Sequence, residues 1–286
     1  MKEKILVVGA TGMLGAPVAR RLKDIGFQVR VVTRQTARAL RLFGESFEVV
    51  ESDVRDLNGL RRALDGCSGV HISLSGTVEL IGVKNIVFVS KSIGIKKITY
   101  VSGTSVSEDN AWFPLIRQKL EVRRIIRKSG ICYTIFCPTW FMESLSRFVK
   151  GNRAYVFGKQ TKPYHFVAAD DFAIMVACSY IRKDADCKRF IVHGPEKILF
   201  RDALERYCAA CHPEVKHISK IPYWLSKIIA RLKRSEEMKY IGNFMEFFEK
   251  VGETGDPEEA NRILGVPNTT LNQWLKDNCG ERLTAS

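Results

Sequence analysis

The residues whose type and spacing most clearly indicate a chemical role are three glycines at a spacing of three, Gly9, Gly12 and Gly15. They follow the apolar run 4–8 and precede an amphipathic stretch, so they occupy a turn between a strand and a helix. Such glycines allow close backbone approach, and the N–H groups and dipole of a helix N-terminus attract a pyrophosphate. An ordinary Gly-rich turn is the alternative, but this context predicts dinucleotide binding. The loop comprises Gly9, Ala10, Thr11, Gly12, Met13, Leu14 and Gly15.

The end of the second expected strand indicates which dinucleotide is bound. Thr33 and Arg34 stand there, Arg38 and Arg41 follow, and the next acid is Glu45. An NAD site usually places an acid at this point, whereas a guanidinium can grip the 2′-phosphate of NADP. The alternative is that Arg34 begins a solvated basic helix. We predict NADP(H), with NAD(H) as the weaker ligand.

Apolar strand-length runs alternate with helical stretches, which predicts a parallel sheet covered on both faces, a doubly wound α/β fold. The expected strands are 4–8, 28–33, 47–51, 69–74, 97–102, 132–137 and 188–192. The expected helices are 14–25, 57–64, 78–92, 115–128, 200–210, 223–232, 237–249, 257–264 and 271–278.

The composition is that of a globular protein: 286 residues, 45% hydrophobic and 27% charged, which argues against disorder and coiled coil. A net charge of +14 favours anionic ligands or surfaces, so phosphates, nucleic acid and lipid headgroups stay open. No apolar run is long enough to span a membrane, and the first one ends at Gly9, too soon for a signal peptide. We therefore expect a cytoplasmic protein whose eight cysteines are reduced thiols.

Motifs spread over roughly residues 1–200 resemble the NmrA-like atypical short-chain dehydrogenases/reductases, which have an NAD(P)-binding Rossmann fold. They are the glycine loop, Val31-Val32-Thr33-Arg34, Asp53-Val54-Arg55-Asp56, Tyr100-Val101-Ser102-Gly103, Lys119, Ser129-Gly130, Tyr133-Thr134-Ile135 and Pro138-Thr139-Trp140-Phe141-Met142-Glu143.

The resemblance implies a bound NADP(H) and assigns positions around it. Asp53 and Val54 would lie near the adenine and Ser75-Gly76 near the ribose. The residues near the nicotinamide would be Pro138, Thr139 and Phe141. Asp53 and Ser75 each follow a strand, at the carboxyl edge where such sheets bind ligands. Asp53 could equally be a helix or turn cap.

One departure from the family pattern bears on catalysis. Many short-chain reductases use a tyrosine as proton donor and a lysine four residues later. Lys119 occupies the lysine position, but Leu115 stands where the tyrosine would be. Either Lys119 or a substrate-bound water transfers the proton, or the dinucleotide is bound without turnover. Lys119 could also be one more solvated base.

Two C-terminal motifs invite other interpretations. The sequence Cys208-Ala209-Ala210-Cys211-His212 matches the pattern of haem attachment, but without an export signal or a second ligand pair we assign it to helix packing and leave a redox role open. The basic, apolar-striped segment 223–234 could lie on an anionic membrane or, more often, pack on the core or a partner. No nucleic-acid module accompanies the charge.

These observations predict a Rossmann-like domain over 1–198, with its core ending near 150, and a helical lobe over 199–286 packed on the sheet edge. The expected function is NADP(H)-dependent reduction of a small carbonyl, enone or quinone-like acceptor. The alternative is a non-catalytic NADP(H) sensor or assembly factor with a protein partner. The candidate pocket residues are Ser102, Thr104, Lys119, Thr139, Trp140, Phe141 and Tyr164.

Overall fold

The structure, a computed structural model, describes residues 3–232 and 236–283 and divides the chain into two compact units. The first comprises Met1–Pro138, Ala169–Val192 and Asp256–Val266, and the second Thr139–Ala168, His193–Gly255 and Pro267–Ser286. Each unit is built from three separate segments of the chain, whereas the sequence prediction placed one boundary after residue 198. Where the domains divide stays a prediction.

The first unit contains a seven-stranded parallel sheet in the order β10-β6-β5-β4-β1-β2-β3. The direction in which successive strands are added reverses between β1 and β4, as in a doubly wound dinucleotide-binding sheet. The predicted fold class is confirmed. The strands are β1 Lys4–Val8, β2 Gln28–Thr33, β3 Glu48–Glu51, β4 Gly69–Ile72, β5 Lys97–Val101, β6 Cys132–Pro138 and β10 Lys188–Val192.

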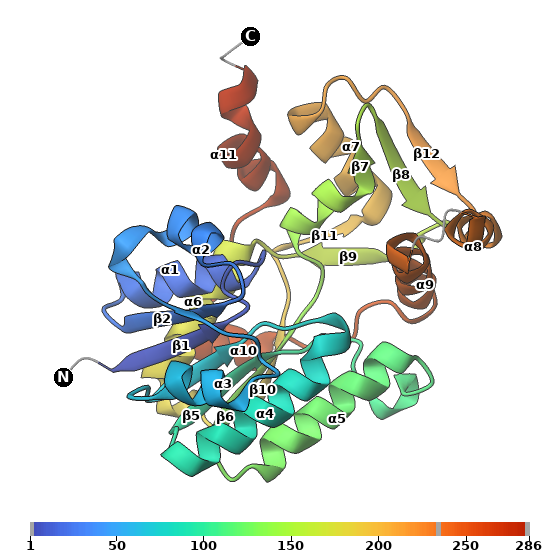
Figure 1. Ribbon diagram of the computed structural model, residues 1–286. Coiled ribbons are helices and arrows are strands. Elements are labelled where there is room, and N and C mark those ends of the chain that lie inside the picture. Colours follow the sequence, from blue (N-terminus) through green and yellow to red (C-terminus); the bar gives the residue numbers. More distant parts are fainter. Residues whose placement is uncertain (1–2, 233–235, 284–286) are drawn as a thin grey trace. The chain divides into compact units, whose positions relative to one another are not determined.

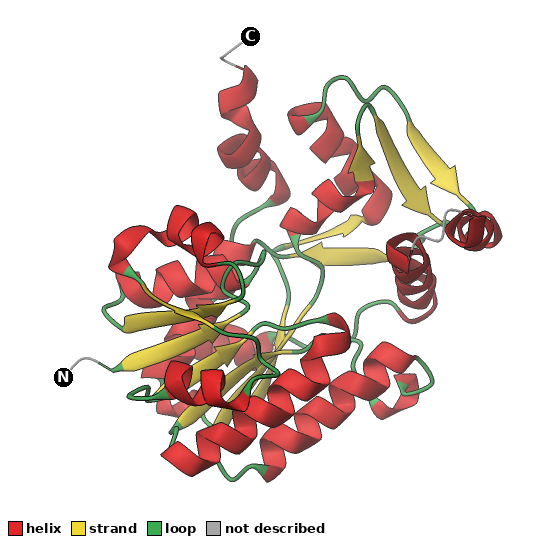
Figure 2. Ribbon diagram, viewed as in Figure 1, coloured by secondary structure: helices red, strands yellow, loops and turns green. Residues whose placement is uncertain are grey.

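Helices flank this sheet on both sides (Figures 1 and 2). Helices α3, α4 and α5 pack in sequence along one face, while α1 and α6 pack together on the other. Apolar side chains of the inner strands are fully buried, as their nearly continuous runs predict. The helices of this unit are α1 Gly15–Asp24, α2 Thr36–Phe43, α3 Leu57–Leu64, α4 Glu79–Ile93, α5 Pro114–Lys128, α6 Ala169–Ile181 and α10 Glu258–Leu264.

The second unit combines two small sheets with helices. One sheet pairs β9 with β11 antiparallel, and the other has the order β12-β8-β7. These short strands are absent from the sequence prediction, which expected mainly helix beyond residue 199. The strands are β7 Val149–Lys150, β8 Arg153–Phe157, β9 Pro163–Phe166, β11 Glu196–Leu199 and β12 Ile218–Ile221. The helices are α7 Phe200–Cys211, α8 Tyr223–Leu232, α9 Glu236–Val251 and α11 Leu271–Leu283.

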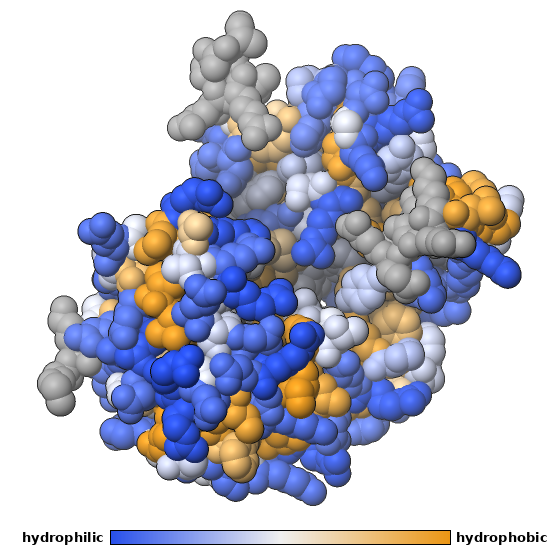
Figure 3. All heavy atoms as spheres, viewed as in Figure 1, coloured by the Kyte–Doolittle hydropathy of each residue, from blue (hydrophilic) through white to orange (hydrophobic). Residues whose placement is uncertain are grey.

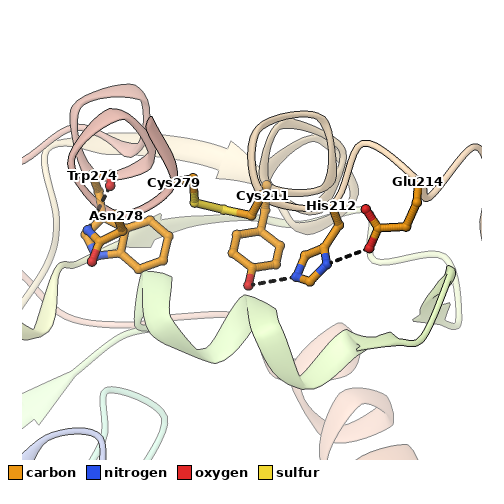
Figure 4. Close-up of a disulfide and its surroundings, with 7 residues drawn as sticks. Cys211, His212, Glu214, Trp274, Asn278 and Cys279 are labelled. Carbon is orange, nitrogen blue, oxygen red and sulfur yellow. Dashed lines mark hydrogen bonds and ion pairs between the residues drawn. A yellow bond between two sulfur atoms is a disulfide. The ribbon is translucent and has the colours of Figure 1, made fainter. Parts of the chain in front are cut away.

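A disulfide joins α7 to α11 in this unit (Figure 4). Cys211 and Cys279 are bonded, with their Cα atoms 5.1 Å apart. The expectation that all eight cysteines are reduced thiols is therefore wrong for these two, because helices 68 residues apart in sequence pack side by side. Cys208 is buried one turn earlier, and His212 contacts Glu214 at 3.1 Å. Because Cys211 is bonded to Cys279, it does not pair with Cys208.

Helix α8 carries exposed apolar side chains at Trp224, Ile228 and Leu232. Figure 3 shows a hydrophobic patch where α8 lies in Figure 1. Among residues 3–232 and 236–283, no helix has the length and apolar character needed to cross a membrane. The predicted basic segment continues to 233 and 234, which lie outside the described residues.

Candidate functional site

The glycine loop forms a tight turn against the end of β4. Gly9 has a φ of +80°, and a Cβ there would lie 2.2 Å from the carbonyl oxygen of Ser73. A Cβ on Gly15 would lie 2.2 Å from the carbonyl oxygen of Gly9, and the Gly12 N–H donates to that oxygen at 3.0 Å. Only glycine fits at the two outer positions. Helix α1 begins at Gly15, so its N-terminus opens directly from this turn.

Beside the turn lies a cavity of about 160 Å³ within the first unit. It is bordered by the ends of β1 and β2 and by the segments that follow β3 and β4. Six predicted cofactor residues meet there: Gly9, Thr11, Thr33, Arg34, Asp53 and Val54. The remaining lining residues are Val8, Val32, Ser52, Leu74 and Val78.

Two arginines bring positive charge to this cavity. Arg34 lies between β2 and α2, and its Nη1 is 3.7 Å from Oδ2 of Asp53, with 69% of the arginine side chain exposed. Arg38, on α2, donates from Nη2 to the Thr11 carbonyl at 3.1 Å. Asp53 also accepts from the Arg55 N–H at 2.9 Å, so the cap interpretation holds alongside its place in the cavity. Arg34 precedes α2, which begins at Thr36, and its role toward a 2′-phosphate stays a prediction.

Lys119 lies in a buried polar cluster below the end of β5. Its Nζ donates to Oε1 of Glu79 at 2.7 Å and lies 3.4 Å from the Tyr100 hydroxyl. Tyr100 donates to the same Glu79 oxygen at 2.7 Å, and Gln118 donates to Oε2 at 3.2 Å. The Lys119 side chain is 13% exposed and that of Glu79 is fully buried. Lys119 is therefore not one more solvated base.

The Tyr100 hydroxyl keeps its proton in this cluster. Burial, reinforced by the charge of Glu79, raises the pKa of Tyr100 well above its usual value. Tyr100 therefore acts as a hydrogen-bond donor to Glu79 rather than as an acid near neutral pH. Sequence reasoning missed Glu79 and Tyr100 as partners of Lys119, since they come from α4 and β5, distant in the chain.

Arg123 is a second buried base on α5, one turn beyond Lys119. It donates from Nε to the Ser102 hydroxyl at 2.8 Å and from Nη2 to the Gly103 carbonyl at 3.0 Å. Burial lowers the pKa of Arg123. Ser102 is thus held at the carboxyl end of β5, where Thr104 also lies, with its N–H donating to the Pro138 carbonyl at 3.1 Å. The four-residue spacing from Lys119 was a signal that could have identified Arg123.

The predicted ribose residues lie on the turn that leads into α4. Gly76 has a φ of +73°, and its carbonyl accepts from Gln118 Nε2 at 2.9 Å. Ser75, just before it, is exposed. Through Gln118, this turn is connected to the same cluster that holds Lys119.

Four predicted pocket residues, Thr139, Trp140, Phe141 and Tyr164, belong to the second unit. Trp140 packs edge-on against several aromatic rings, and Tyr164 is fully buried, its hydroxyl donating to the Phe248 carbonyl at 3.0 Å. The structure therefore places Trp140 and Tyr164 in a packed core, which differs from the expected role as pocket walls. An aromatic core needs no ligand to explain it.

Thr139 belongs to a polar group that the sequence did not indicate. Its hydroxyl donates to Oε2 of Glu253 at 2.7 Å, and Oε1 of Glu253 contacts Nδ1 of His165. The His193 ring stacks on the His165 ring at 4.7 Å with planes 8° apart. The candidate ligand atoms of the three ionisable residues lie within 4.8 Å of one another. A metal lies close to the plane of each imidazole that binds it, so these parallel rings cannot share one ion as they stand.

The sequence pattern of the NmrA-like family matches residues 1–198. The chain belongs to the NmrA-like family. This confirms the resemblance seen in the motifs of the first 200 residues.

Three proteins illustrate what this family member is similar to. A (4-alkanoyl-5-oxo-2,5-dihydrofuran-3-yl)methyl phosphate reductase of Streptomyces griseus is 29% identical over 69% of this chain and 70% of its own length. Photosystem II assembly factor Ycf39 of Cyanophora paradoxa is 31% identical over 49% of this chain and 46% of its own. The NADPH complex of quinone oxidoreductase QOR2 from Escherichia coli superposes with a TM-score of 0.76 at 19% identity, covering 96% of this chain and 99% of that one.

Proposed function

We propose that this NmrA-like protein is an NADP(H)-dependent reductase of the atypical short-chain type. The observation that carries the proposal is the cavity that joins the glycine turn to Arg34, with Arg38 beside it and no acid at the end of β2. The NADPH-dependent quinone oxidoreductase of the same fold and the (4-alkanoyl-5-oxo-2,5-dihydrofuran-3-yl)methyl phosphate reductase among its relatives support it.

The residues of the cavity fit one end of an NADP(H) molecule, its adenine and 2′-phosphate, and the turn beside the cavity fits the diphosphate. A Cβ on Gly12 would lie 3.2 Å from the Gly9 carbonyl oxygen, so the turn is closely packed there as well. The N-terminus of α1 offers N–H groups and a positive dipole to the diphosphate. The Arg34 guanidinium, largely exposed and only loosely paired with Asp53, is available to a 2′-phosphate. Apolar Val54, Leu74 and Val78 offer a surface for the adenine.

When bound, NADPH supplies the hydride for reduction. Lys119 is the candidate proton donor of the chain, and Glu79, with Tyr100 and Gln118 as further partners, fixes its ammonium group. Arg123 holds the Ser102 hydroxyl by a hydrogen bond at the carboxyl end of β5. The assignments of Ser75, Gly76, Pro138, Thr139 and Phe141 to the cofactor remain predictions of this proposal.

The proposed substrate is a small molecule with a carbonyl, enone or quinone-like acceptor. Trp140 and Tyr164 are both buried in a core, so they give no information about the shape of the substrate. The acceptor class therefore rests on hydride chemistry and on the reductases among the relatives.

The test is NADPH consumption with a panel of quinones, enones and carbonyls. Lys119→Met should lower kcat by about 100-fold or more, the usual contribution of a positioned proton donor, and should change the pH profile. Lys119→Arg keeps the charge, and Lys84→Met, at an exposed position on α4, is the matched control with unchanged rates. No acceptor-dependent oxidation by the folded protein would count against a reductase.

A second candidate is a dinucleotide sensor or assembly factor that changes partner affinity on binding NADP(H). Leu115 in the tyrosine position and the similarity to Ycf39 favour it. Such coupling requires that NADPH favour one partner-binding state. Partner occupancy measured with and without saturating NADPH, and with an Arg34→Asp variant, separates the two functions. Unchanged occupancy in all three samples argues against the sensor.

A further inference from the structure

A second, larger cavity of the first unit lies away from the glycine turn. It has a volume of about 730 Å³ and runs along the outer side of α5, bordered by the segment 106–111 and by Arg189 on β10. Its volume is within the range of small-molecule sites, about 300–1,000 Å³. We refer to this cavity as the α5 groove. Its basic lining residues are Arg117, Arg123, Arg124, Arg127, Lys128 and Arg189.

Basic side chains dominate the α5 groove. Six of the lining residues are basic and two, Glu108 and Glu121, are acidic. The two ends of the helical row, Arg117 and Lys128, are eleven residues apart, which corresponds to about 16 Å along the helix axis. The positive charge is therefore spread along the groove rather than placed at one point.

Some of these charges are already satisfied within the protein. Arg124 grips Glu121 with two hydrogen bonds of 2.9 Å, and Arg123 is buried against Ser102 and backbone carbonyls. By contrast, Arg127, Lys128 and Arg189 are exposed and form no ion pair in the part of the chain that the structure describes.

The cations of the groove lie close enough to repel one another. The charges of Arg189 and Arg127 add to the effect of burial in lowering the pKa of Arg123. An anion placed among them would relieve this repulsion. The groove thus has a net positive charge that its own two carboxylates do not neutralise.

The number of exposed cations in the groove favours a phosphate over a carboxylate as the ligand. One of its two carboxylates, Glu121, is hydrogen-bonded to the guanidinium of Arg124 and also feels the charge of Lys128. Three further exposed cations suit a group with more acceptor atoms, and a phosphate offers three oxygens in a geometry that guanidinium forks match. We propose that the α5 groove binds a ligand that carries two or more phosphate groups, held chiefly by Arg127, Lys128 and Arg189, with Arg117 at the far end.

The probe for this site is inorganic tripolyphosphate, titrated calorimetrically into the full chain at physiological ionic strength. One ligand should bind per chain, and Arg127→Glu/Arg189→Glu should weaken binding by at least tenfold. Arg61→Glu/Arg62→Glu, on exposed positions of α3, changes the net charge equally and should stay within twofold of the parent. Equal losses in both double variants would show attraction to net charge alone and overturn the proposal.

Two further arms locate the anion and its source. Arg34→Ala should leave tripolyphosphate affinity unchanged; a loss as large as in the groove variant would place the anion in the glycine-turn cavity and overturn the proposal. Tighter binding of a glutamate octapeptide than of tripolyphosphate would also overturn it, in favour of an acidic protein segment. Capture by phosphatidylcholine vesicles containing phosphatidylinositol 4-phosphate, reversed by tripolyphosphate, would support a lipid headgroup as the source, and binding of free tripolyphosphate alone a soluble one.

Discussion

Lys119 Nζ lies 2.7 Å from Oε1 of Glu79, a carboxylate that is fully buried at the first turn of α4. The two side chains therefore form an ion pair inside the sheet-and-helix core of the first unit, with the Tyr100 hydroxyl as a third member. The lysine at the position that the family pattern assigns to catalysis is therefore also a structural residue of this core.

Breaking this pair should destabilise the fold. Lys119→Met leaves the Glu79 charge buried without its cation, at a cost of about 3–5 kcal/mol in the free energy of unfolding. Glu79→Gln, which retains an acceptor for Tyr100, should cost a similar amount, and the double variant less than the sum. The measurement is a double-mutant cycle by urea unfolding. The exposed Glu121–Arg124 pair on the same helix is the control and should show a much weaker coupling, because solvent screens it. Additive effects at Glu79 and Lys119 would contradict the pairing.

Gly9 should not tolerate a side chain. Gly9→Ala places a Cβ 2.2 Å from a backbone oxygen at a positive φ, whereas Gly130 has a similar φ of +78° with open space around it. Gly130→Ala should cost about 1–2 kcal/mol through backbone conformation alone. Gly9→Ala should cost about 1–3 kcal/mol more, through overpacking, and should also weaken NADPH binding. Chemical denaturation compares the two; equal costs would mean that the turn is not tightly packed.

The Cys211–Cys279 bond should make stability depend on redox conditions. It closes a sequence separation of 68 residues, which corresponds to about 4 kcal/mol in the chain-entropy account. Cys279→Ser should lower the thermal midpoint under oxidising conditions and have no such effect once the parent is reduced. Cys208→Ser, at a buried thiol outside the bond, should have the same effect in both conditions. If the thermal midpoint of the parent protein did not change when reductant is added, the disulfide would be contradicted.

His71 should contribute to acid sensitivity. Burial lowers the pKa of His71 to about 3, and its Nδ1 lies 2.8 Å from the Thr99 hydroxyl. Between about pH 6.5 and 3 the unfolded chain binds a proton at this histidine that the folded chain does not. The free energy of unfolding therefore falls by up to about 1.4 kcal/mol per pH unit as the pH drops. His71→Leu should flatten this slope between pH 6 and 4, while His217→Leu, at an exposed position, should not. Equal slopes in all three proteins would exclude His71.

The sheet of the first unit could be predicted because its inner strands are apolar throughout. The expected strands 28–33 and 188–192 match β2 and β10 at both ends. The short strands of the second unit were missed because two- to five-residue strands with mixed exposure carry little periodic signal.

The candidate site was predictable where one motif carries it and not where distant segments meet. The glycine loop and Arg34 were identified from residue type and spacing, and Asp53 from the family resemblance. Gly9, Thr11, Arg34 and Asp53 border one cavity. Glu79 is forty residues from Lys119, and Cys211 is 68 from Cys279, so neither pairing leaves a local pattern. Trp140 was predicted to line the pocket but is buried in an aromatic core, because an aromatic residue in a family motif can equally pack inside a core.

The central claim is that the cavity beside the glycine turn binds NADP(H) and that Arg34 reads its 2′-phosphate. Calorimetric titration of the parent and of Arg34→Asp with NADPH and NADH tests it most directly. Charge-assisted hydrogen bonds contribute about 1.5–3 kcal/mol each, so the variant should bind NADPH about 100-fold more weakly or worse, with little change for NADH. Equal affinity of the parent for both nucleotides, or an equal loss of both in the variant, would contradict the account.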